Sequence, residues 1–535
     1  MTTKQSLSEI LQAICHQLSL PEDFNFDINC PSSEEFGDYA TNLALVAAKN
    51  LKINPLELAT KIRDLSLAQP EVKKMFIKVE VIKPGFINFF LSQNYLESEL
   101  SNILKNKKKY GQSSIGKGKK VQVEFISANP TGPLTLANGR GGFLGDVLAN
   151  ILDMSGYKVE REYLINDAGN QISTLGKSVL AASGLMPKEE NHYVGDYIQT
   201  WADSHSVELE KYKDQPEVVG KQLADYLFGE KIKPVIEQGM KIKFDKWFSE
   251  DKELHQKNKV KQAVDFLIKN KLTYEAEGAV WFATTKFGDD KDRVLITSDG
   301  RYTYLSIDVA YHLNKFKRGF DKVINIWGAD HGGYIARMQA ATEALGYPGQ
   351  LDIIIIQLVK LAVGGQEVKM SKRKGDYVTM EYLLELLPLD VIRWFFLMYA
   401  THTHMTIDLD LAKDKSEKNP VYYVQYAYAR LSNILVEAKK YPLAKNNKLE
   451  IGALEMIKPL LQWPELVLDI TETYQVNQLT TYAMSIADNF HRFYQKYRVI
   501  DNGIVNQPRY NIVLAYQIVL GSVLNVMGIS APEKM

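Results

Sequence analysis

Apolar residues recur at helical spacing from residue 6 to about residue 65. In LSEILQAICHQL four of them share one helix face: Leu7, Ile10, Leu11 and Ile14. In NPLELATKI, Asn54 stands before Pro55, which favours a capped helix start. FIKVEVIKPGFINFFLS then alternates around Pro84 and Gly85, which predicts two strands joined by a turn. The amino-terminal part is therefore predicted to be an α+β domain.

Short apolar strands alternate with helical patterns in the middle of the chain. VQVEFI and YKVEREYLI are each followed by a helix, and DKVINIWGAD and LDIIIIQLVKL flank the helical YIARMQAATEALGY. This alternation is typical of a parallel, doubly wound (Rossmann-like) α/β sheet. A charged segment near 188–277 interrupts it and is predicted to be an insertion.

The chain from Met380 onward is almost wholly helical in pattern, which predicts an all-α carboxyl-terminal domain. The stretch NKKKYGQSSIGKGKK (106–120) is a predicted domain boundary, either a solvated linker or a lysine-rich contact with a polyanion. The predicted domains are residues 1–112, 118–380 and 381–535.

The composition limits the classes of function that the chain can have. The chain has 64 basic and 64 acidic residues, so no net field attracts nucleic acid, and a polyanion must be met by local patches. Cys15 and Cys30 form no C-x-x-C pair and histidines number only nine, so we expect reduced thiols and no metal site. The start MTTKQSLSEI lacks an apolar signal core and no apolar run could span a bilayer, which predicts a soluble, cytoplasmic protein without a membrane partner.

SANPTGPLTLANGRGG (127–142) is a proline- and glycine-rich loop that leads from a strand into a helix. Gly139, Gly141 and Gly142 would let a ligand approach the backbone, and a helix N-terminus offers free N–H groups to a phosphate. The loop has neither a Walker lysine nor G-x-G-x-x-G, so a tight turn without a ligand is equally consistent with this segment alone.

GGQEVKMSKRKGDYVTM (364–380) is a lysine-rich loop before a helix. Lysines in such a loop can close over a triphosphate and neutralise charge on departing pyrophosphate.

Several segments together carry a family resemblance. KMSKR (369–373) resembles a KMSKS loop, and ANPTGPLTLANGRG stands where a HIGH-type signature is expected. REYLINDAGNQI, YTYLSIDVAYHL, INIWGADHGGY, NPVYYVQYAYAR and FGDYATNLALVAAKNL are similar to stretches of the same family. The chain thus resembles, over nearly its full length, the class I aminoacyl-tRNA synthetases and, within them, the arginyl-tRNA synthetases.

The resemblance implies a ligase that joins L-arginine to tRNA(Arg) through an arginyl-adenylate, using ATP with Mg²⁺ as the substrate complex. It also implies a monomer. A non-catalytic tRNA-binding relative with a decayed signature is the main alternative. A cytidylyltransferase-like enzyme would lack the long helical domain, and a cysteinyl-tRNA synthetase would need zinc-binding cysteines.

Catalytic and nucleotide-binding residues follow from the resemblance. Thr135, Asn138, Lys369 and Lys372 are predicted to be catalytic. Further residues are predicted to contact ATP: Ala128, Asn129, Pro130, Thr131, Gly132, Pro133, Leu134, Leu136, Ala137, Gly139, Gly328, Asp330, His331, Met370 and Ser371.

The amino-acid pocket implied by the resemblance consists of Glu124, Ser127, Asn129, Tyr304 and Asp308. Asp308 is the predicted guanidinium partner, because carboxylates match the donor fork of arginine. Tyr304 and Asp308 are four residues apart and would share a helix face.

The signature departs from the family at four positions, where Thr135, Leu136, Ala137 and Asn138 replace His-Val-Gly-His. A threonine hydroxyl and an asparagine amide can still donate hydrogen bonds to phosphate oxygens. We therefore expect an active enzyme, although the methyl group of Ala137 would crowd the adenine.

The resemblance also implies tRNA contacts at both ends of the chain. Phe86 and Asn88 in the amino-terminal domain would stack on and hydrogen-bond to an unstacked base of the D-loop. Tyr423, Tyr426 and Arg430 in the DALR-type carboxyl-terminal domain would contact anticodon bases. Each of these aromatic residues is also compatible with a place in the core.

Overall fold

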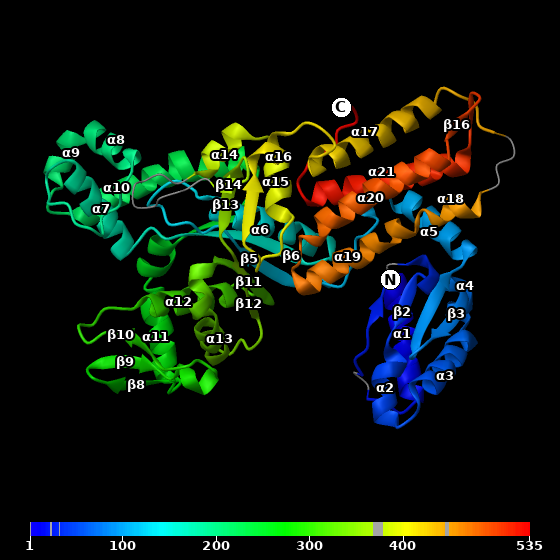
Figure 1. The fold of residues 1–535 in the computed structure, drawn as a ribbon. Helices are drawn as coiled ribbons and strands as arrows, with labels where there is room; N and C mark the ends of the chain where they lie inside the picture. The colour runs from blue at the N-terminus through cyan, green and yellow to red at the C-terminus, as the bar shows by residue number, and fades with distance from the viewer. Residues whose placement is uncertain (1, 22–23, 32, 368–377, 445–448) are drawn as a thin grey trace.

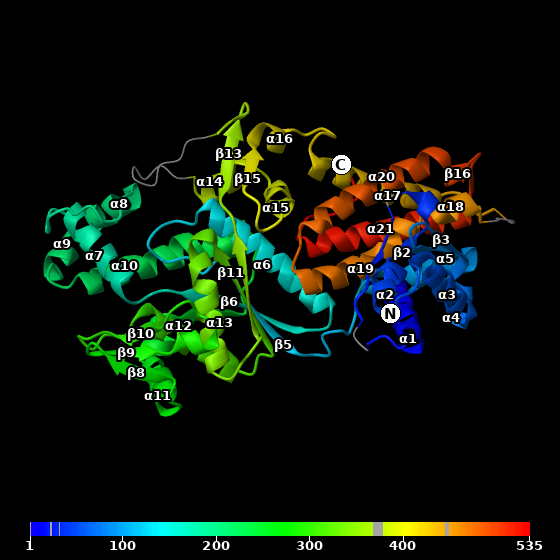
Figure 2. The same ribbon diagram turned by 60° about the horizontal axis from the view of Figure 1, so that its bottom comes forward.

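The computed structural model describes residues 2–21, 24–31, 33–367, 378–444 and 449–535. Figure 1 shows a small amino-terminal domain, a central part built on a parallel sheet, and a carboxyl-terminal bundle of helices. The amino-terminal domain lies beside the carboxyl-terminal helices, and helices α7 (Asn170–Ala182) to α10 (Pro216–Tyr226) project from the opposite end of the molecule (Figures 1 and 2).

The amino-terminal domain has an antiparallel sheet in the order β1-β2-β4-β3. β3 and β4 are the two strands predicted around Pro84 and Gly85, so that prediction is confirmed. Thr2 caps α1, Asn54 caps α3 as predicted, and α1 buries Leu7, Leu11 and Ile14 of its predicted apolar face. The elements are α1 (Thr3–Gln17), β1 (Ile28–Asn29), η1 (Glu34–Phe36), β2 (Tyr39–Thr41), α2 (Leu43–Leu51), α3 (Pro55–Ala68), α4 (Pro70–Met75), β3 (Phe76–Ile82), β4 (Phe86–Leu91), α5 (Gln93–Asn106) and η2 (Lys107–Lys109).

The central sheet is parallel throughout, in the order β12-β11-β5-β6-β7, which confirms the predicted doubly wound class. The chain adds β6 and β7 on one side of β5 and then returns to add β11 and β12 on the other. The strand order therefore reverses between β5 and β11, and ligands of such sheets bind at the carboxyl ends of the strands at this point. The strands are β5 (Lys120–Glu124), β6 (Lys158–Ile165), β7 (Lys246–Ser249), β11 (Lys322–Gly328) and β12 (Leu351–Ile356).

Helices cover this sheet on both faces. The predicted helix after the glycine-rich loop is α6, which buries Leu144, Val147, Leu148, Ile151 and Leu152. α6 contacts β5, β6, β11 and β12, so its first turn lies close to the place where the strand order reverses. The other helices of this part are α7 (Asn170–Ala182), α12 (Tyr304–Lys317) and α13 (Ile335–Ala344), with α6 spanning Leu136–Met154.

The prediction of a single insertion near 188–277 is wrong in part. β7 lies inside this range and pairs with β6, with Phe248 fully buried. Its four residues are flanked by charged ones, so the strand leaves little signal in the sequence. The range contains α8 (Asp196–Ser204), α9 (Ser206–Lys211), α10 (Pro216–Tyr226), η3 (Leu227–Ile232), η4 (Val235–Gly239), η5 (Asp251–His255), α11 (Lys259–Lys269) and β8 (Thr273–Ala276). β8 continues into a small antiparallel sheet with β9 (Ala279–Phe282) and β10 (Arg293–Ile296), with η6 (Thr284–Phe287) between the last two.

LDIIIIQLVKL forms two strands, β12 and β13, where the sequence predicts one. β13 pairs with β14 in an antiparallel manner and with β15 in a parallel manner. β15 follows residue 381, whereas the other two strands of this sheet precede it. The elements are η7 (Ala329–Tyr334), β13 (Val359–Val363), β14 (Gln366–Glu367), α14 (Met380–Leu386), α15 (Leu389–Leu397), β15 (Met405–Asp408) and α16 (Leu409–Lys413).

The carboxyl-terminal helices anchor the amino-terminal domain. Glu465 of α19 is buried and accepts hydrogen bonds of 2.9 Å from Tyr39 Oη and from the backbone N–H of Lys4. No helix in the described part of the chain is long and apolar enough to cross a membrane. The elements are α17 (Pro420–Ala438), α18 (Ile451–Glu455), α19 (Lys458–Thr473), α20 (Gln478–Lys496), β16 (Ile500–Asp501), β17 (Ile504–Val505) and α21 (Gln507–Val526).

Candidate functional site

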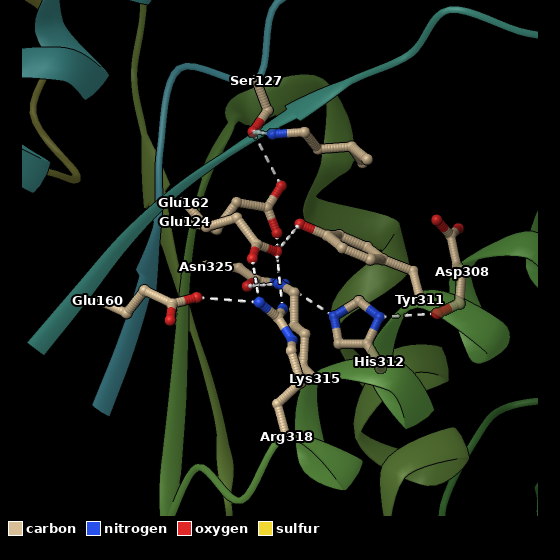
Figure 3. Close-up of polar contacts among 11 residues, drawn as sticks. Glu124, Ser127, Glu160, Glu162, Asp308, Tyr311, His312, Lys315, Arg318 and Asn325 are labelled. Atoms are coloured by element: carbon tan, nitrogen blue, oxygen red, sulfur yellow. Dashed lines mark hydrogen bonds and ion pairs between the residues drawn. The ribbon is translucent and has the colours of Figure 1, made fainter. Parts of the chain in front are cut away.

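Glu124 ends β5 at the point where the strand order reverses. Its side chain forms an ion pair with Nζ of Lys315 and accepts a hydrogen bond of 3.0 Å from Ser127 Oγ. Ser127 Oγ in turn accepts a hydrogen bond of 3.1 Å from the backbone N–H of Leu164 in β6 (Figure 3). Glu124 and Ser127, both predicted to line the amino-acid pocket, therefore lie together at the ligand-binding edge of the sheet.

Helix α12 carries Tyr304 and Asp308 one turn apart. Tyr304 is exposed and Asp308 is partly buried. Burial, with smaller contributions from the negative charges of Glu250 and Glu124, raises the pKa of Asp308 to about 7. The charges of Glu250 and Glu124 both act on Asp308, so the three acids lie in one neighbourhood, and carboxylates suit a planar cation such as guanidinium.

Glu250 is a residue of this site that the sequence analysis missed. It directly follows β7, is 8% exposed, and its Oε1 lies 3.0 Å from Nε2 of His255. The hydrogen bond to Glu250 raises the pKa of His255. Because β7 runs parallel to β5, Glu250 lies, like Glu124, at the carboxyl ends of the strands. Recognising WFS as a sheet strand would have located it.

The loop between β5 and α6 has an unusual backbone. Ile126 and Ser127 adopt φ values of 67° and 37°, in the left-handed region that β-branched residues rarely enter. Such strain is concentrated at ligand-binding sites, where surrounding contacts hold it in place. The contacts to the loop are Tyr163 Oη to Ala128 O (2.9 Å), Asn166 Nδ2 to Asn129 Oδ1 (2.6 Å) and Tyr197 Oη to Thr131 O (2.6 Å). The predicted ATP contacts Pro130, Gly132, Pro133 and Leu134 belong to the same loop.

Thr135 and Asn138 form a reciprocal cap at the N-terminus of α6. Thr135 Oγ1 and the Thr135 backbone N–H donate to Asn138 Oδ1 at 2.8 and 2.9 Å, and Asn138 N–H donates to Thr135 Oγ1 at 3.4 Å. Helix geometry leaves the N–H group of Ala137 without an intrahelical acceptor, whereas the antiparallel bridge between Thr135 and Thr379 engages the N–H group of Leu136. The turn therefore presents a free donor and the positive end of a helix dipole.

The glycines after this turn serve packing. A Cβ atom at Gly139 would collide with the sulfur of Met380, and at Gly142 it would crowd Met240 and Ile126. Gly139, Gly141 and Gly142 are all buried inside α6. The expectation that they open the backbone to a ligand is therefore wrong, because protein side chains already occupy the space beside Gly139 and Gly142.

The segment that precedes α14 meets the α6 loop directly. The backbone N–H of Met380 donates to Leu134 O at 2.9 Å, and Thr379 forms a β-bridge with Thr135. The lysine-rich loop therefore ends against the first turn of α6. Its predicted residues Lys369, Met370, Ser371 and Lys372 lie outside the described residues.

Gly328 ends β11, which neighbours β5, and Asp330 and His331 follow it in η7. The side chains of Asp330 and His331 are 82% and 56% exposed, and the His331 ring lies 5.8 Å from that of Trp327. These residues stand at the open edge of the sheet, with their polar groups available to a ligand.

The two predicted residues of the amino-terminal domain differ in exposure. Phe86, at the start of β4, is 40% exposed and could stack on a base. Asn88 is only 2% exposed, because β4 runs between β2 and β3. The expectation that Asn88 hydrogen-bonds to a base is therefore wrong for this conformation.

The predicted residues of α17 form one cluster with α20. Tyr426 is 52% exposed and stacks beside His491, with 6.3 Å between ring centroids and 29° between the ring planes. Tyr423 Oη donates to Asp488 at 2.6 Å, and the Arg430 guanidinium lies over the ring of Tyr494. We call these six residues the α17–α20 cluster. It offers aromatic faces and a cation to an unstacked base.

Three family models match consecutive parts of the chain. The arginyl-tRNA synthetase N-terminal domain matches residues 2–91, the class I (R) tRNA synthetase catalytic domain matches 99–387, and the DALR anticodon-binding domain matches 424–535. The chain is 43% identical to the arginine–tRNA ligase of Listeria welshimeri, over 99% of this chain and 98% of that one. This chain belongs to the arginyl-tRNA synthetases.

Other members of the arginyl-tRNA synthetase family are also similar to this chain in sequence or in fold. The arginine–tRNA ligase of Bacillus subtilis is 41% identical over 99% of both chains. The arginyl-tRNA synthetase of Thermus thermophilus has the same fold, with a TM-score of 0.74 over all of both chains at 20% identity. The cytidylyltransferase-like and cysteinyl alternatives are thereby excluded, and a non-catalytic relative is not favoured.

Proposed function

We propose that this arginyl-tRNA synthetase joins L-arginine to its cognate tRNA in two steps at the carboxyl edge of the central sheet. A carboxylate oxygen of arginine attacks the α-phosphorus of ATP, and pyrophosphate leaves. A terminal ribose hydroxyl of tRNA then attacks the carbonyl carbon, and AMP leaves. Both steps depend mainly on positioning and on stabilising phosphate charge.

The carboxyl groups of Glu124, Glu250 and Asp308 carry the proposal for arginine. Glu124 and Glu250 lie at the carboxyl ends of the parallel strands β5 and β7, and their charges act on Asp308 of α12. A guanidinium is a fixed fork of donors that matches carboxylates. Asp308 is assigned the guanidinium and Tyr304 covers it, while Ser127 and Asn129 complete the pocket.

ATP is proposed to lie across the N-terminus of α6. Ala137 offers a backbone donor and Asn138 offers its amide. Leu136, Ala128, Thr131 and the Gly328–His331 turn flank the nucleotide. Lys369 and Lys372 are proposed to neutralise the departing pyrophosphate. The contact between Met380 and Leu134 supports this pairing, because it fixes one end of their loop beside α6. Mg²⁺ would enter with ATP as part of the substrate.

Residues 1–112 are proposed to contact the D-loop through Phe86, residues 118–380 to hold the reaction site, and residues 381–535 to bind the anticodon arm through the α17–α20 cluster. A cytoplasmic monomer remains the expected form.

Charging of purified tRNA with each radiolabelled amino acid tests the reaction. The purified chain should transfer arginine alone, and only with ATP present. Transfer of another amino acid would overturn the proposed pocket. A folded chain that binds tRNA(Arg) without charging it would support the non-catalytic alternative.

A further inference from the structure

Lys315 is a fully buried cation behind the proposed arginine pocket. Its Nζ forms an ion pair with Glu124 and donates a hydrogen bond of 2.9 Å to Asn325 Oδ1. Lys315 lies on α12 and Glu124 on β5, so the pair joins a helix to a sheet strand (Figure 3). A buried lysine is rare unless it is paired, and this one is paired with a residue assigned to substrate.

A chain of hydrogen bonds determines which atom of the Asn325 amide faces Lys315. His312 Nδ1 lies 2.8 Å from the backbone oxygen of Asp308, which can only accept, so Nδ1 carries the proton. Burial lowers the pKa of His312 to about 3, so its Nε2 is free to accept from Asn325 Nδ2 at 2.8 Å. The amide of Asn325 must then turn its oxygen toward Lys315.

We propose that Lys315 is a positioning residue for arginine binding: it balances the charge of Glu124 and holds that carboxylate in the orientation that the substrate meets. This inference rests on the proposed function. Ser127 holds one oxygen of Glu124 and Lys315 holds the other, so the carboxylate cannot rotate. Each oxygen keeps a second acceptor position for a donor of the substrate.

Stability alone is a weak reason for this ion pair. Replacing a buried pair by apolar residues of similar volume is often neutral or stabilising, whereas removing one partner leaves a costly unpaired charge. The pair also sets the charge of the pocket. Lys315 balances the negative charge of Glu124, and His255 is paired with Glu250. The side chain of Asp308, by contrast, makes no ion pair within the described residues. One acid is thus left for the guanidinium.

The test compares the KM for arginine with the KM for ATP in Lys315→Met, Glu124→Gln and the double variant. We expect Lys315→Met to raise the KM for arginine about tenfold or more, with the KM for ATP within about twofold of the parent chain's. Lys317→Met is the matched control, because Lys317 is exposed on the same helix, and it should change neither constant.

The double variant keeps the proposal falsifiable if Lys315→Met does not fold, because it buries no unpaired charge. If Lys315 acts through Glu124, adding Lys315→Met to Glu124→Gln will leave the KM for arginine unchanged. A further rise, or a folded Lys315→Met with normal arginine kinetics, would overturn the proposal. If Glu124→Gln itself has no effect, the proposed pocket fails instead.

Discussion

Thr135 and Asn138 cap the first turn of α6 reciprocally, and this leaves their polar groups with different tasks. Thr135 Oγ1 donates its hydrogen to Asn138 Oδ1 at 2.8 Å, so this hydroxyl has no proton left for a phosphate. The backbone N–H of Thr135 also meets Oδ1, which fixes the orientation of the amide. Asn138 Nδ2 is therefore the side-chain donor that can replace a histidine of the usual signature.

Asn138→Asp should lower activity sharply while keeping the cap. The aspartate retains an oxygen for Thr135 but removes the amide donor and adds negative charge near phosphate. Loss of one transition-state donor costs about 2.7–4 kcal/mol, or about 10²–10³-fold in kcat. Pyrophosphate exchange with arginine and tRNA present measures this. Asn138→Ala should also slow the reaction, and unchanged rates in both variants would remove Asn138 from the mechanism.

Gly139→Ala should destabilise the junction between α6 and α14, because its methyl group meets the sulfur of Met380. Overpacking of this kind costs about 1–3 kcal/mol. Urea unfolding should detect the loss, and the KM for ATP should rise as Leu134 shifts. Adding Met380→Ala should restore part of the stability.

Gly229→Ala is the matched control for Gly139→Ala, because a Cβ atom at Gly229 meets no atom within 4 Å. If Gly139→Ala is as stable as this control, Met380 does not fill the space beside α6 in solution.

The affinity for arginine should rise with pH and level off above pH about 7. Burial, with Glu250 and Glu124 beside it, raises the pKa of Asp308 to about 7, while the charges of Lys315 and Arg337 oppose the shift. Guanidinium binds the ionised carboxylate, so binding below this pH must release a proton. Calorimetry in two buffers of different ionisation enthalpy measures the release.

Asp308→Asn should bind arginine weakly at every pH and show no such inflection. His255→Gln is a needed comparison, because the pKa of His255 is also raised. An inflection that persists in Asp308→Asn and vanishes in His255→Gln would assign the titration to His255.

Tyr426→Ala should weaken tRNA binding by about 1–3 kcal/mol, the range found for bases stacked on aromatic side chains. The ring is half exposed and its centroid lies 6.3 Å from that of His491, so its loss removes a stacking surface without opening the core. The KM for tRNA should rise while the KM for arginine stays unchanged. Tyr426→Phe keeps the ring and should behave as the parent chain; equal KM values for tRNA in all three would contradict the role.

Elements with strong local patterns were predictable, and those without them were not. The helix after the glycine-rich loop and the turn at Pro84 and Gly85 were correctly predicted, because periodicity and turn chemistry are local. β7 was missed because four residues carry no reliable period, and Glu250 was missed with it. Asn88 was misjudged because exposure depends on the neighbouring strands.

Partners across long sequence separations also lay beyond the sequence. Arg393 is buried and links α15 to Asp146 of α6 at 2.8 Å and to the backbone oxygen of Met527 at 3.2 Å. Arg140 is buried as well and donates to Gln357 O and Ala400 O, both at 2.8 Å. Neither guanidinium could be assigned to structure rather than to a ligand before its acceptors were known.

The sequence by itself determined the helices, the doubly wound sheet and the segments that identify the family, because propensity, periodicity and motif are properties of neighbouring residues. Only the tertiary structure decided which acids meet at the sheet edge, and that Thr135 caps while Asn138 keeps a free donor. It also decided that Met380 fills the space beside Gly139. These depend on distances between segments far apart in the chain, which are set when the apolar faces pack and the buried polar groups find partners.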